Sequence, residues 1–448
     1  MTETIYALSS APGKAGVSVV RVSGPAAGQS LSILTRGKTH SPRKAHLSYL
    51  YDGEQVIDHA MVVLFAPPAS FTGETVVEYH LHGSRAVIDS LFTVLASQPG
   101  HRLAEPGEFT RRAFENGKMD LTKAEAIADL IDAETQSQKD QALQQMSGAL
   151  SALYEGWRER LIKSLAYVEA IIDFPDEEIP DSETAKAKPG IELLCADISA
   201  HLNDNRRGER LRDGLKLVVI GAPNAGKSSL VNLLAGRDVA IVSDISGTTR
   251  DVIDVPMTIT GYPVILSDTA GLRPEAVGET GHDKLESEGI KRARARAQTA
   301  DIKILVFDGT APQRCSATFD LHDENALIVI NKNDQITPAQ KQIYADIPNA
   351  VFVSAQTQEG ISEFLDVLSA KIKQVMDVPR GHVSLTRARH REALTHALGR
   401  LSHALNAPSP ELMAEDLRLS ARALGRITGR VDVEDLLDVI FRDFCIGK

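Results

Sequence analysis

The chain has 448 residues, of which 43% are apolar and 24% are charged. A chain of this length can bury several cores and divide into about two to four domains. Its formal net charge of -11 argues against a protein that coats nucleic acid by bulk electrostatics, because such a protein needs a clustered basic surface.

The expected cellular location is the cytoplasm. No apolar run is long enough to cross a bilayer, and the start "MTETIYALSS" lacks the basic and apolar regions of a signal peptide, so we expect no membrane association. The cysteines, Cys195, Cys315 and Cys445, lie far apart and without zinc-ligand spacing. The sequence therefore predicts a reducing compartment, with neither a disulfide framework nor a zinc site.

Residues 1–118 alternate short β-type runs with turns. The runs are "GVSVVRVSG", "HAMVVLFAPP" and "TVVEYHLHG", and the helix-like stretch "SRAVIDSLFTVLAS" follows them. Short runs rich in β-branched residues and separated by turn residues are typical of strands. We expect a compact α+β domain here.

Residues 119–212 and 377–448 have a helical pattern. Their apolar side chains recur every three or four residues, which lines one face of long helices. The recurring positions are Leu143, Met146, Leu150, Leu153, Trp157, Leu161, Leu165, Val168, Ile172, Leu394, Leu398, Leu401 and Leu405. Between the two helical parts, residues 213–376 alternate strands such as "LKLVVIG" and "ALIVINKND" with helices. The sequence predicts a multidomain α+β chain in which an α/β domain with a mostly parallel sheet interrupts a discontinuous helical domain.

A phosphate-binding loop begins the inserted domain. The strand "LKLVVI" runs into "GAPNAGKSS", a G-x4-G-K-S pattern that continues into a helix. This order lets backbone N–H groups of residues 224–229 cradle phosphates, with Lys227 reaching the β/γ-phosphates and Ser228 binding Mg²⁺. The loop residues are Asn224, Ala225, Gly226, Lys227, Ser228 and Ser229.

Further motifs follow in the order of a GTP-binding domain. "GTTRD" supplies Thr248 and Thr249 for a switch loop that closes on Mg²⁺ and the γ-phosphate, with Thr249 as a Mg²⁺ ligand. "DTAG" (Asp268, Thr269, Ala270, Gly271) places Asp268 on the metal side and the Gly271 N–H at the γ-phosphate.

Two later motifs predict guanine specificity. In "NKND" (Asn331, Lys332, Asp334), the Asp334 carboxylate can accept the two N–H groups that guanine presents and adenine lacks. "SAQ" (Ser354, Ala355, Gln356) can offer backbone N–H groups to guanine O6. After "DTAG", Leu272 stands where Ras-like proteins carry a glutamine, and a leucine cannot orient water. We expect a Ras-like P-loop G domain that organises catalysis differently.

The motifs "GAPNAGKSS", "GTTRD", "DTAGLR" and "FCIGK", with "PGEFTRRAFENGKMDLTKAEAIADLIDAET", resemble the MnmE (TrmE) family of tRNA-modification GTPases over the whole chain. The resemblance implies a K⁺ ion held by Asn224, Ser243, Ile245 and Thr248, which supplies the positive charge that an arginine finger supplies elsewhere. It also implies that G domains of two chains dimerise during hydrolysis. A switch-II glutamate would orient water, at Glu286 or, because the preceding loop is longer than in the family, at Glu288.

The same resemblance implies an N-terminal domain similar to folate-binding enzymes, with a site for 5-formyltetrahydrofolate or a related one-carbon tetrahydrofolate at Arg21, Glu78, Lys118 and Lys448. A carboxylate can pair with pterin N–H groups, and cations can hold the glutamate tail. From spacing alone, Glu78, His80 and His82 share one strand face, which favours a solvated face over a metal site. Ser84 stands where the family has a second glycine.

The C-terminal stretch "FCIGK" allows several interpretations of its role. Cys445 stands at a prenylation position, but Gly447 and Lys448 match that motif poorly and no polybasic run precedes them. Periodicity alone fits the end of an amphipathic helix with a buried cysteine. The family resemblance instead implies a tail that reaches the folate pocket and places Cys445 near the chemistry.

The function implied is a cytoplasmic, K⁺-dependent GTP hydrolase. By resemblance it forms a homodimer through the N-terminal domain and joins a flavoprotein, MnmG (GidA), in a heterotetramer. Together they would add a C5 carboxymethylaminomethyl or aminomethyl-type group to wobble uridine U34 of certain tRNAs. An alternative is a ribosome-assembly switch resembling Era or Der, but no KH-type GXXG loop is found. A membrane-tethered signalling GTPase would depend on the tail alone.

Overall fold

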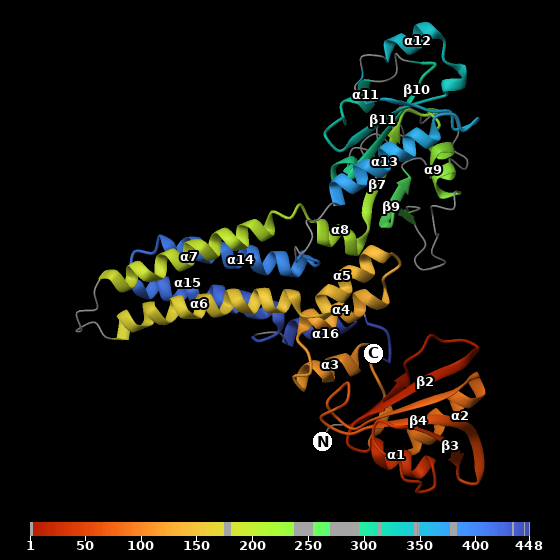
Figure 1. Cartoon of the computed structure of the whole chain (residues 1–448), viewed down its shortest axis with the longest axis vertical. Coiled ribbons are helices and arrows are strands. Elements are labelled where there is room, and N and C mark those ends of the chain that lie inside the picture. Colours follow the sequence, from red (N-terminus) through yellow and green to blue (C-terminus); the bar gives the residue numbers. More distant parts are fainter. Residues whose placement is uncertain are drawn as a thin grey trace, which may run out of the picture. The chain divides into compact units, whose positions relative to one another are not determined.

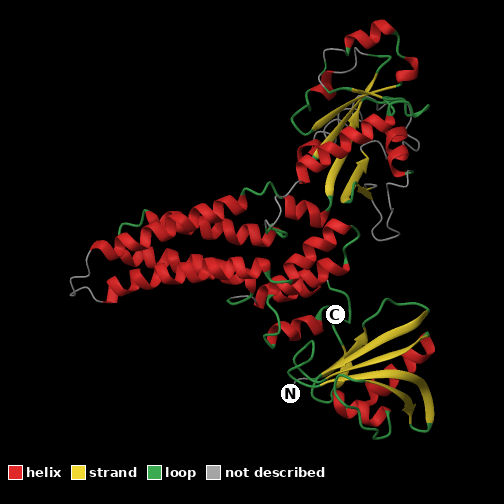
Figure 2. Cartoon of the chain, viewed as in Figure 1, coloured by secondary structure: helices red, strands yellow, loops and turns green. Residues whose placement is uncertain are grey.

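The computed structural model of the chain describes residues 3–173, 181–236, 254–268, 295–311, 316–344, 347, 349–376, 383–431, 434–442 and 444–447. The chain divides into two compact units. The first comprises Met1–Ala128, Gln144–Leu194 and His396–Lys448, and the second comprises Asp129–Leu143 and Cys195–Thr395. Each unit contains one six-stranded sheet with helices (Figures 1 and 2).

The sheet of the first unit has the strand order β3-β4-β5-β2-β1-β6. Its strands are β1 (Thr4–Leu8), β2 (Ala15–Ser23), β3 (Ala45–Asp52), β4 (Gln55–Phe65), β5 (Val76–Gly83) and β6 (His101–Leu103). All neighbours are antiparallel except β1 and β6. The three runs predicted from sequence form β2, β4 and β5, whereas β1, β3 and β6 were not singled out.

Two helices cover one face of this sheet, α1 (Ala27–Leu34) and α2 (Arg85–Ser97). Val77, Tyr79 and Leu81 of β5 are buried against them, and the alternate residues of β5 face the other way, as period two requires. Ser84 has an extended backbone and its side chain accepts a hydrogen bond from Val87 N at 3.2 Å, which caps α2. A glycine is therefore not needed at this position.

Besides α1 and α2, the helices with most of their residues in the first unit are α3 (Glu108–Glu115), α4 (Leu121–Ile131), α6 (Ala149–Asp173), α7 (Asp181–Leu202), α14 (Ala388–Leu405), α15 (Pro410–Thr428) and α16 (Glu434–Arg442). α6 packs against α15, and Trp157 and Leu161 of α6 are buried. The predicted stripe is broken at Gly148, which has a φ of 90° and separates α6 from α5 (Gln136–Met146). For that reason Leu143 and Met146 are 41% and 40% exposed.

The second unit is a doubly wound α/β domain with the strand order β12-β11-β10-β7-β9-β8. Its strands are β7 (Leu215–Gly221), β8 (Asp254–Ile259), β9 (Tyr262–Asp268), β10 (Ile302–Asp308), β11 (Ala326–Asn331) and β12 (Val351–Phe352). Its other elements are α8 (Arg207–Asp213), α9 (Lys227–Ala235), α11 (Ser316–Phe319), α12 (Pro338–Ile343), α13 (Ile361–Met376) and the 3₁₀ helix η2 (Asn333–Gln335). Only β8 and β9 are antiparallel among these paired strands, and separate apolar clusters bury the two faces of the sheet. The predicted multidomain α+β class with an inserted α/β domain is confirmed.

Candidate functional site

The loop between β7 and α9 has a backbone that few residue types adopt. Asn224 and Gly226 have φ values of 65° and 92°, in the left-handed region. A Cβ on Gly226 would collide with Asn331 Nδ2, so only glycine fits there. Ser228 and Ser229 lie exposed in the first turn of α9. Loop N–H groups and the positive end of a helix thus lie together, which is an arrangement that binds phosphate.

Asn331 joins this loop to the loop that follows β12. Asn331 is 3% exposed, and its Nδ2 donates to the Ala225 carbonyl oxygen at 2.8 Å. Its Oδ1 accepts a hydrogen bond from Ala355 N at 3.0 Å. Lys227 Nζ donates to the Ala222 carbonyl oxygen at 2.9 Å, which holds the ammonium group over the loop. The P-loop and the 354–356 loop are therefore fixed to each other by a buried amide.

Charged groups at the ends of β10 and β11 are held ionised. A hydrogen bond from Ser354 is the main cause that lowers the pKa of Asp334, which is fully exposed. Burial would raise the pKa of Asp308, but hydrogen bonds from Lys332 and Thr310 outweigh it and lower this pKa. Lys332 Nζ lies 2.6 Å from Asp308 Oδ2. Asp334 is thus an accessible carboxylate acceptor beside the 354–356 loop, in which Gln356 is exposed.

Several predicted residues lie outside the part of the chain that the structure describes. They are Ser243, Ile245, Thr248, Thr249, Thr269, Ala270, Gly271, Leu272, Glu286, Glu288 and Lys448. Of Asp268 only the backbone is described, at the end of β9 and paired in parallel with Val219 of β7. Asp268 therefore ends the strand that neighbours β7, the strand that leads into the P-loop. Ligands bind at this end of the strands in such sheets.

In the first unit, Arg21 and Glu78 form a cross-strand ion pair between β2 and β5. Arg21 donates from Nε and Nη2 to Glu78 Oε1 at 3.1 and 2.9 Å, and the side chains are 18% and 19% exposed. The Arg21 guanidinium carbon lies 5.1 Å from the ring centre of Phe71 and 5.7 Å from that of Phe109. His80 Nε2 is 3.7 Å from Glu78 Oε2. The pair is partly desolvated and held between aromatic rings, which strengthens it.

Residues 444–447 lie against the N-terminal domain of the same unit. Cys445 is exposed, and its carbonyl oxygen accepts a hydrogen bond from Gly107 N at 3.4 Å. Ile446 pairs with Pro106 in an antiparallel bridge. The Gly447 carbonyl oxygen accepts a hydrogen bond from Ser9 Oγ at 2.8 Å. The tail thus reaches the end of β1, the neighbour of the strand that carries Arg21.

Among the hydrogen bonds and ion pairs of the described residues, none joins Lys118 to Arg21 or Glu78. Its Nζ donates to the Pro68 carbonyl oxygen at 2.8 Å, and its methylenes contact the position where Gly73 lacks a Cβ. The structure brings Arg21 and Glu78 together directly, and it brings the tail to the adjoining strand.

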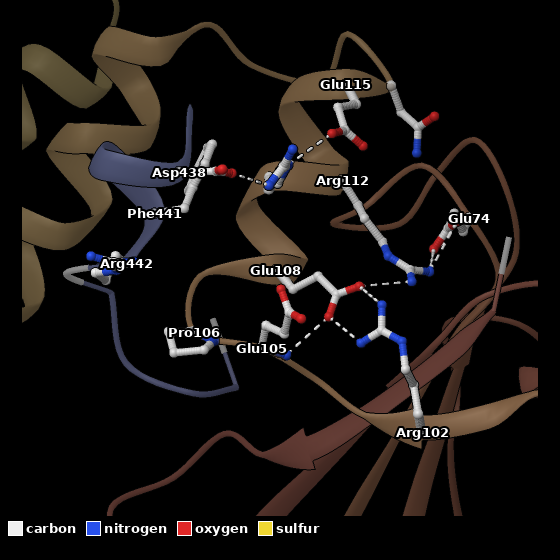
Figure 3. Close-up of a pocket in the computed structure, with 12 residues that line it drawn as sticks. Glu74, Arg102, Glu105, Pro106, Glu108, Arg112, Glu115, Asp438, Phe441 and Arg442 are labelled. Atoms are coloured by element: carbon white, nitrogen blue, oxygen red, sulfur yellow. Dashed lines mark hydrogen bonds and ion pairs between the residues drawn. The ribbon is translucent and has the colours of Figure 1, made fainter. Parts of the chain in front are cut away.

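A cavity of about 600 Å³ is lined by residues of α3 and α16 and of the segment before α3 (Figure 3). Arg102 makes a bidentate pair with Glu108, with N–O distances of 2.7 and 2.6 Å, and Arg112 donates to Glu108 at 2.9 Å and to Glu74 at 3.2 Å. Burial would raise the pKa of Glu108, but its hydrogen bonds from Arg102, from the Glu105 backbone and from Arg112 outweigh that effect and lower it. Sequence reasoning used this segment only for its resemblance. The turn signal Pro106-Gly107 before a glutamate at a helix start could have indicated it.

Within the described ranges, no group of three or more His, Cys, Asp or Glu residues is placed to hold a metal ion. Among the helices with described residues, none has the length and apolar character needed to cross a membrane.

Two family models match the chain. The model for the MnmE helical domain matches residues 121–445, and the model for the GTP-binding protein TrmE N-terminus matches residues 4–118. The chain is 54% identical over 453 residues to the tRNA modification GTPase MnmE of Parvibaculum lavamentivorans, covering 100% of both chains. It is 49% identical over 450 residues to that of Paramagnetospirillum magneticum, also covering 100% of both.

Solved structures resemble part of the chain. The G domain of the Thermotoga maritima iron transporter FeoB is 26% identical, with a TM-score of 0.24, and the match covers 36% of this chain and 98% of that one. A probable GTP-binding protein, EngB, is 18% identical with a TM-score of 0.26, over 36% of this chain and 98% of its own.

Proposed function

Because the chain belongs to the MnmE family of tRNA modification GTPases, we propose that it hydrolyses GTP to drive modification of the wobble uridine U34 in certain tRNAs. The observation that carries this proposal is identity along the full length of named tRNA-modifying relatives. The added group would be a C5 carboxymethylaminomethyl or aminomethyl-type group.

The substrate GTP would bind across the loops joined by Asn331. The backbone of residues 224–229 would hold the phosphates, with the Lys227 ammonium group beside them. Asp334 would accept the two guanine N–H groups, and its lowered pKa supports this because a carboxylate accepts both while a carboxylic acid does not. The predicted backbone donors Ser354, Ala355 and Gln356 would face guanine O6.

Two cations would assist. Ser228 and Thr249 would ligate Mg²⁺, and the exposed Ser228 hydroxyl supports this because Mg²⁺ prefers oxygen ligands. Asn224, Ser243, Ile245 and Thr248 would hold K⁺, for which the exposed Asn224 amide in the P-loop is a suitable oxygen donor. A bound cation supplies positive charge that stabilises the transferring phosphoryl group. Glu286, or Glu288, would orient the attacking water.

The N-terminal domain would bind 5-formyltetrahydrofolate at Arg21, Glu78, Lys118 and Lys448, which supplies the one-carbon unit. The partly buried Arg21–Glu78 pair supports this because it combines a pterin acceptor with a guanidinium donor that is already oriented. The tail position supports a role for Cys445 near that site.

The proposed assembly is a homodimer that works with the flavoprotein MnmG. The flavoprotein would supply redox chemistry and much of the tRNA surface, which suits a chain with a net charge of -11. We further propose four segments: 1–118 for folate binding and dimerisation, 119–212 and 377–448 for the helical domain, and 213–376 for the G domain.

The test is mass spectrometry of tRNA nucleosides from cells that lack this protein. We expect a C5-modified wobble uridine to disappear and to return with the intact chain but not with Cys445→Ser. Unchanged nucleosides in the deletion strain would exclude the modification function and favour the ribosome-assembly switch.

A further inference from the structure

Three consecutive residues at the start of α3 contact three different parts of the proposed one-carbon site. Gly107 contacts the tail, Glu108 contacts an ion-pair network, and Phe109 contacts Arg21. All belong to the first unit. Because neighbouring residues in a helix turn hold fixed relative positions, a shift of one shifts the others.

Gly107 forms the surface on which the tail rests. It has a φ of 68°, and a Cβ there would lie 2.7 Å from the Phe441 carbonyl oxygen and 3.0 Å from Phe444 Cβ. Its N–H donates to the Cys445 carbonyl oxygen, and the preceding Pro106 pairs with Ile446. Phe444 is 7% exposed while Cys445 is exposed. The backbone on both sides of the cysteine is therefore held, and its thiol is presented outward.

Glu108 fixes the Pro106–Gly107 turn to the sheet. The residue is 8% exposed, and its carboxylate accepts a hydrogen bond from the backbone N of Glu105 at 2.9 Å, which closes the turn. It also accepts from Arg102 of β6 and from Arg112 of α3 (Figure 3). A buried carboxylate with this many donors has one stable position, because losing any of them leaves charge unpaired.

The network continues to the strand that carries Arg21. Arg112 donates to Glu74, and Ser23 Oγ donates to Glu74 Oε2 at 2.8 Å. Ser23 lies two residues after Arg21 on β2. Phe109, which is 0% exposed, meets the Arg21 guanidinium directly. The start of α3 is thus tied both to the tail and to the strand of the Arg21–Glu78 pair.

We propose that Glu108 is a positioning residue that sets the place of the Cys445 thiol relative to the Arg21–Glu78 pair. It contacts neither the thiol nor the pair, and it acts through Gly107 on one side and through Phe109 and Arg112 on the other. The inference rests on the proposed function, because it assumes that the tail and the ion pair serve one reaction. It adds a residue to which the family resemblance gave no role.

The test compares Glu108→Gln with the intact chain and with Glu115→Gln, a change at the exposed end of the same helix. All chains carry Cys195→Ser and Cys315→Ser, so that Cys445 is the only native cysteine left. Alkylation by iodoacetamide is followed to its limiting rate at high pH, which removes differences in thiol ionisation. Folate affinity, GTP hydrolysis and tRNA modification are measured on the same samples.

With Glu108→Gln we expect the limiting alkylation rate of Cys445 to rise about fivefold, because the backbone on both sides of the thiol is then held less firmly. Modification turnover should fall about tenfold or more, because small misplacements of a reacting group cost this much. GTP hydrolysis should be unchanged, and so should all properties of Glu115→Gln. A disulfide between Pro106→Cys and Ile446→Cys, added to Glu108→Gln, should restore slow alkylation of Cys445 and normal turnover while it is intact, since bridged strand neighbours suit a disulfide. Its reduction should lower turnover again.

An unchanged alkylation rate in Glu108→Gln would overturn the proposal, and so would lost turnover that the disulfide does not restore. If Glu108→Gln does not fold, Arg102→Lys, which keeps the charge but breaks the bidentate pair with Glu108, replaces it with and without the disulfide under the same criteria. If the intact chain does not modify tRNA, the proposed function fails. The alkylation rates then still decide whether Glu108 holds the tail.

Discussion

Arg21 and Glu78 lie opposite each other on β2 and β5, and both Arg21 donors bind the same oxygen, Glu78 Oε1. The second oxygen, Oε2, is 3.7 Å from His80 Nε2 and accepts no hydrogen bond from Arg21 among the described contacts. Two residues that sequence reasoning assigned to one ligand are thus already paired, and a pterin would have to use Oε2 or displace Arg21.

Glu78→Gln is expected to weaken binding of 5-formyltetrahydrofolate about tenfold to a hundredfold. The amide offers one acceptor oxygen and no charge, so it loses the charge-assisted bonds to both Arg21 and the pterin. Calorimetric titration measures the affinity. Glu54→Gln, in the exposed turn between β3 and β4, is the control and should bind normally. Equal affinities for the two variants would exclude Glu78 from the folate site.

Asp334→Asn is expected to weaken GTP binding about a hundredfold and to favour xanthosine triphosphate. An amide replaces one acceptor by a donor, which mismatches the guanine N–H pair and suits a base that carries a carbonyl there. Competition against a fluorescent guanine nucleotide measures both affinities. Glu359→Gln, a change next to the 354–356 loop, is the control and should keep the preference for GTP. Retained guanine selectivity in Asp334→Asn would contradict the assignment.

Gly226→Ala is expected to abolish nucleotide binding. Its added Cβ would collide with Asn331 Nδ2 in a left-handed backbone, which would break the amide bridge to Ala225. Equilibrium binding of a fluorescent GDP measures the loss. Gly399→Ala, where a Cβ meets nothing within 4 Å, is the matched change and should bind normally. Normal binding by both variants would show that the loop tolerates the collision.

Replacing K⁺ by Na⁺ is expected to slow GTP hydrolysis about tenfold or more, because the larger ion fits the proposed oxygen cage. Asn224→Gly removes the amide ligand while keeping the left-handed backbone that Asn224 has at a φ of 65°. In that variant the rates in the two salts should converge at the lower value. A preserved K⁺ effect would remove Asn224 from the cation site.

Glu108→Gln is expected to destabilise the first unit near neutral pH by about 3 kcal/mol, because it removes the buried charge that Arg102 and Arg112 share and leaves them only Glu3 and Glu74 as charge partners among the described residues. The pKa of Glu108 is lowered in the folded chain. The stabilisation is therefore fully present above the ordinary carboxyl pKa of about 4.3, and it is lost as pH falls through the lowered value. The difference in free energy of unfolding between the intact chain and Glu108→Gln should therefore become smaller below about pH 4.

The fluorescence of the single tryptophan, Trp157, can measure this difference in stability. Trp157 is 5% exposed in α6, within the first unit, so its fluorescence reports melting of that unit alone. Melting curves at neutral and acid pH give the two differences, with Glu115→Gln as the control. A difference of equal size at both pH values would show that the carboxylate charge contributes nothing.

Local order along the chain made the strand–loop–helix arrangement of the P-loop predictable. Strand, loop and helix follow one another at residues 215–235, so spacing alone predicts where Lys227 lies. The alternation on β5 likewise predicted the face of Glu78. Neither pattern could predict that Glu78 pairs with Arg21, because that depends on the register of β2 against β5.

The ion-pair network was beyond sequence reasoning for the same reason. Glu108 takes its partners from β6, from α3 and from its own turn, and single charged residues give no periodic pattern. The predicted apolar face of the helix wrongly included Leu143 and Met146. Gly148, with its left-handed backbone, separates α5 from α6, so the two helices do not share one continuous face.

The hydrogen bond between Ser9 and Gly447 joins residues 438 positions apart. During synthesis, the ribosome completes the whole nucleotide-binding unit before Gly447 exists. A nascent or truncated chain can therefore fold a G domain while the proposed one-carbon site is still open at the tail. Premature termination near the end of the message would release a GTPase that turns over nucleotide without a seated thiol.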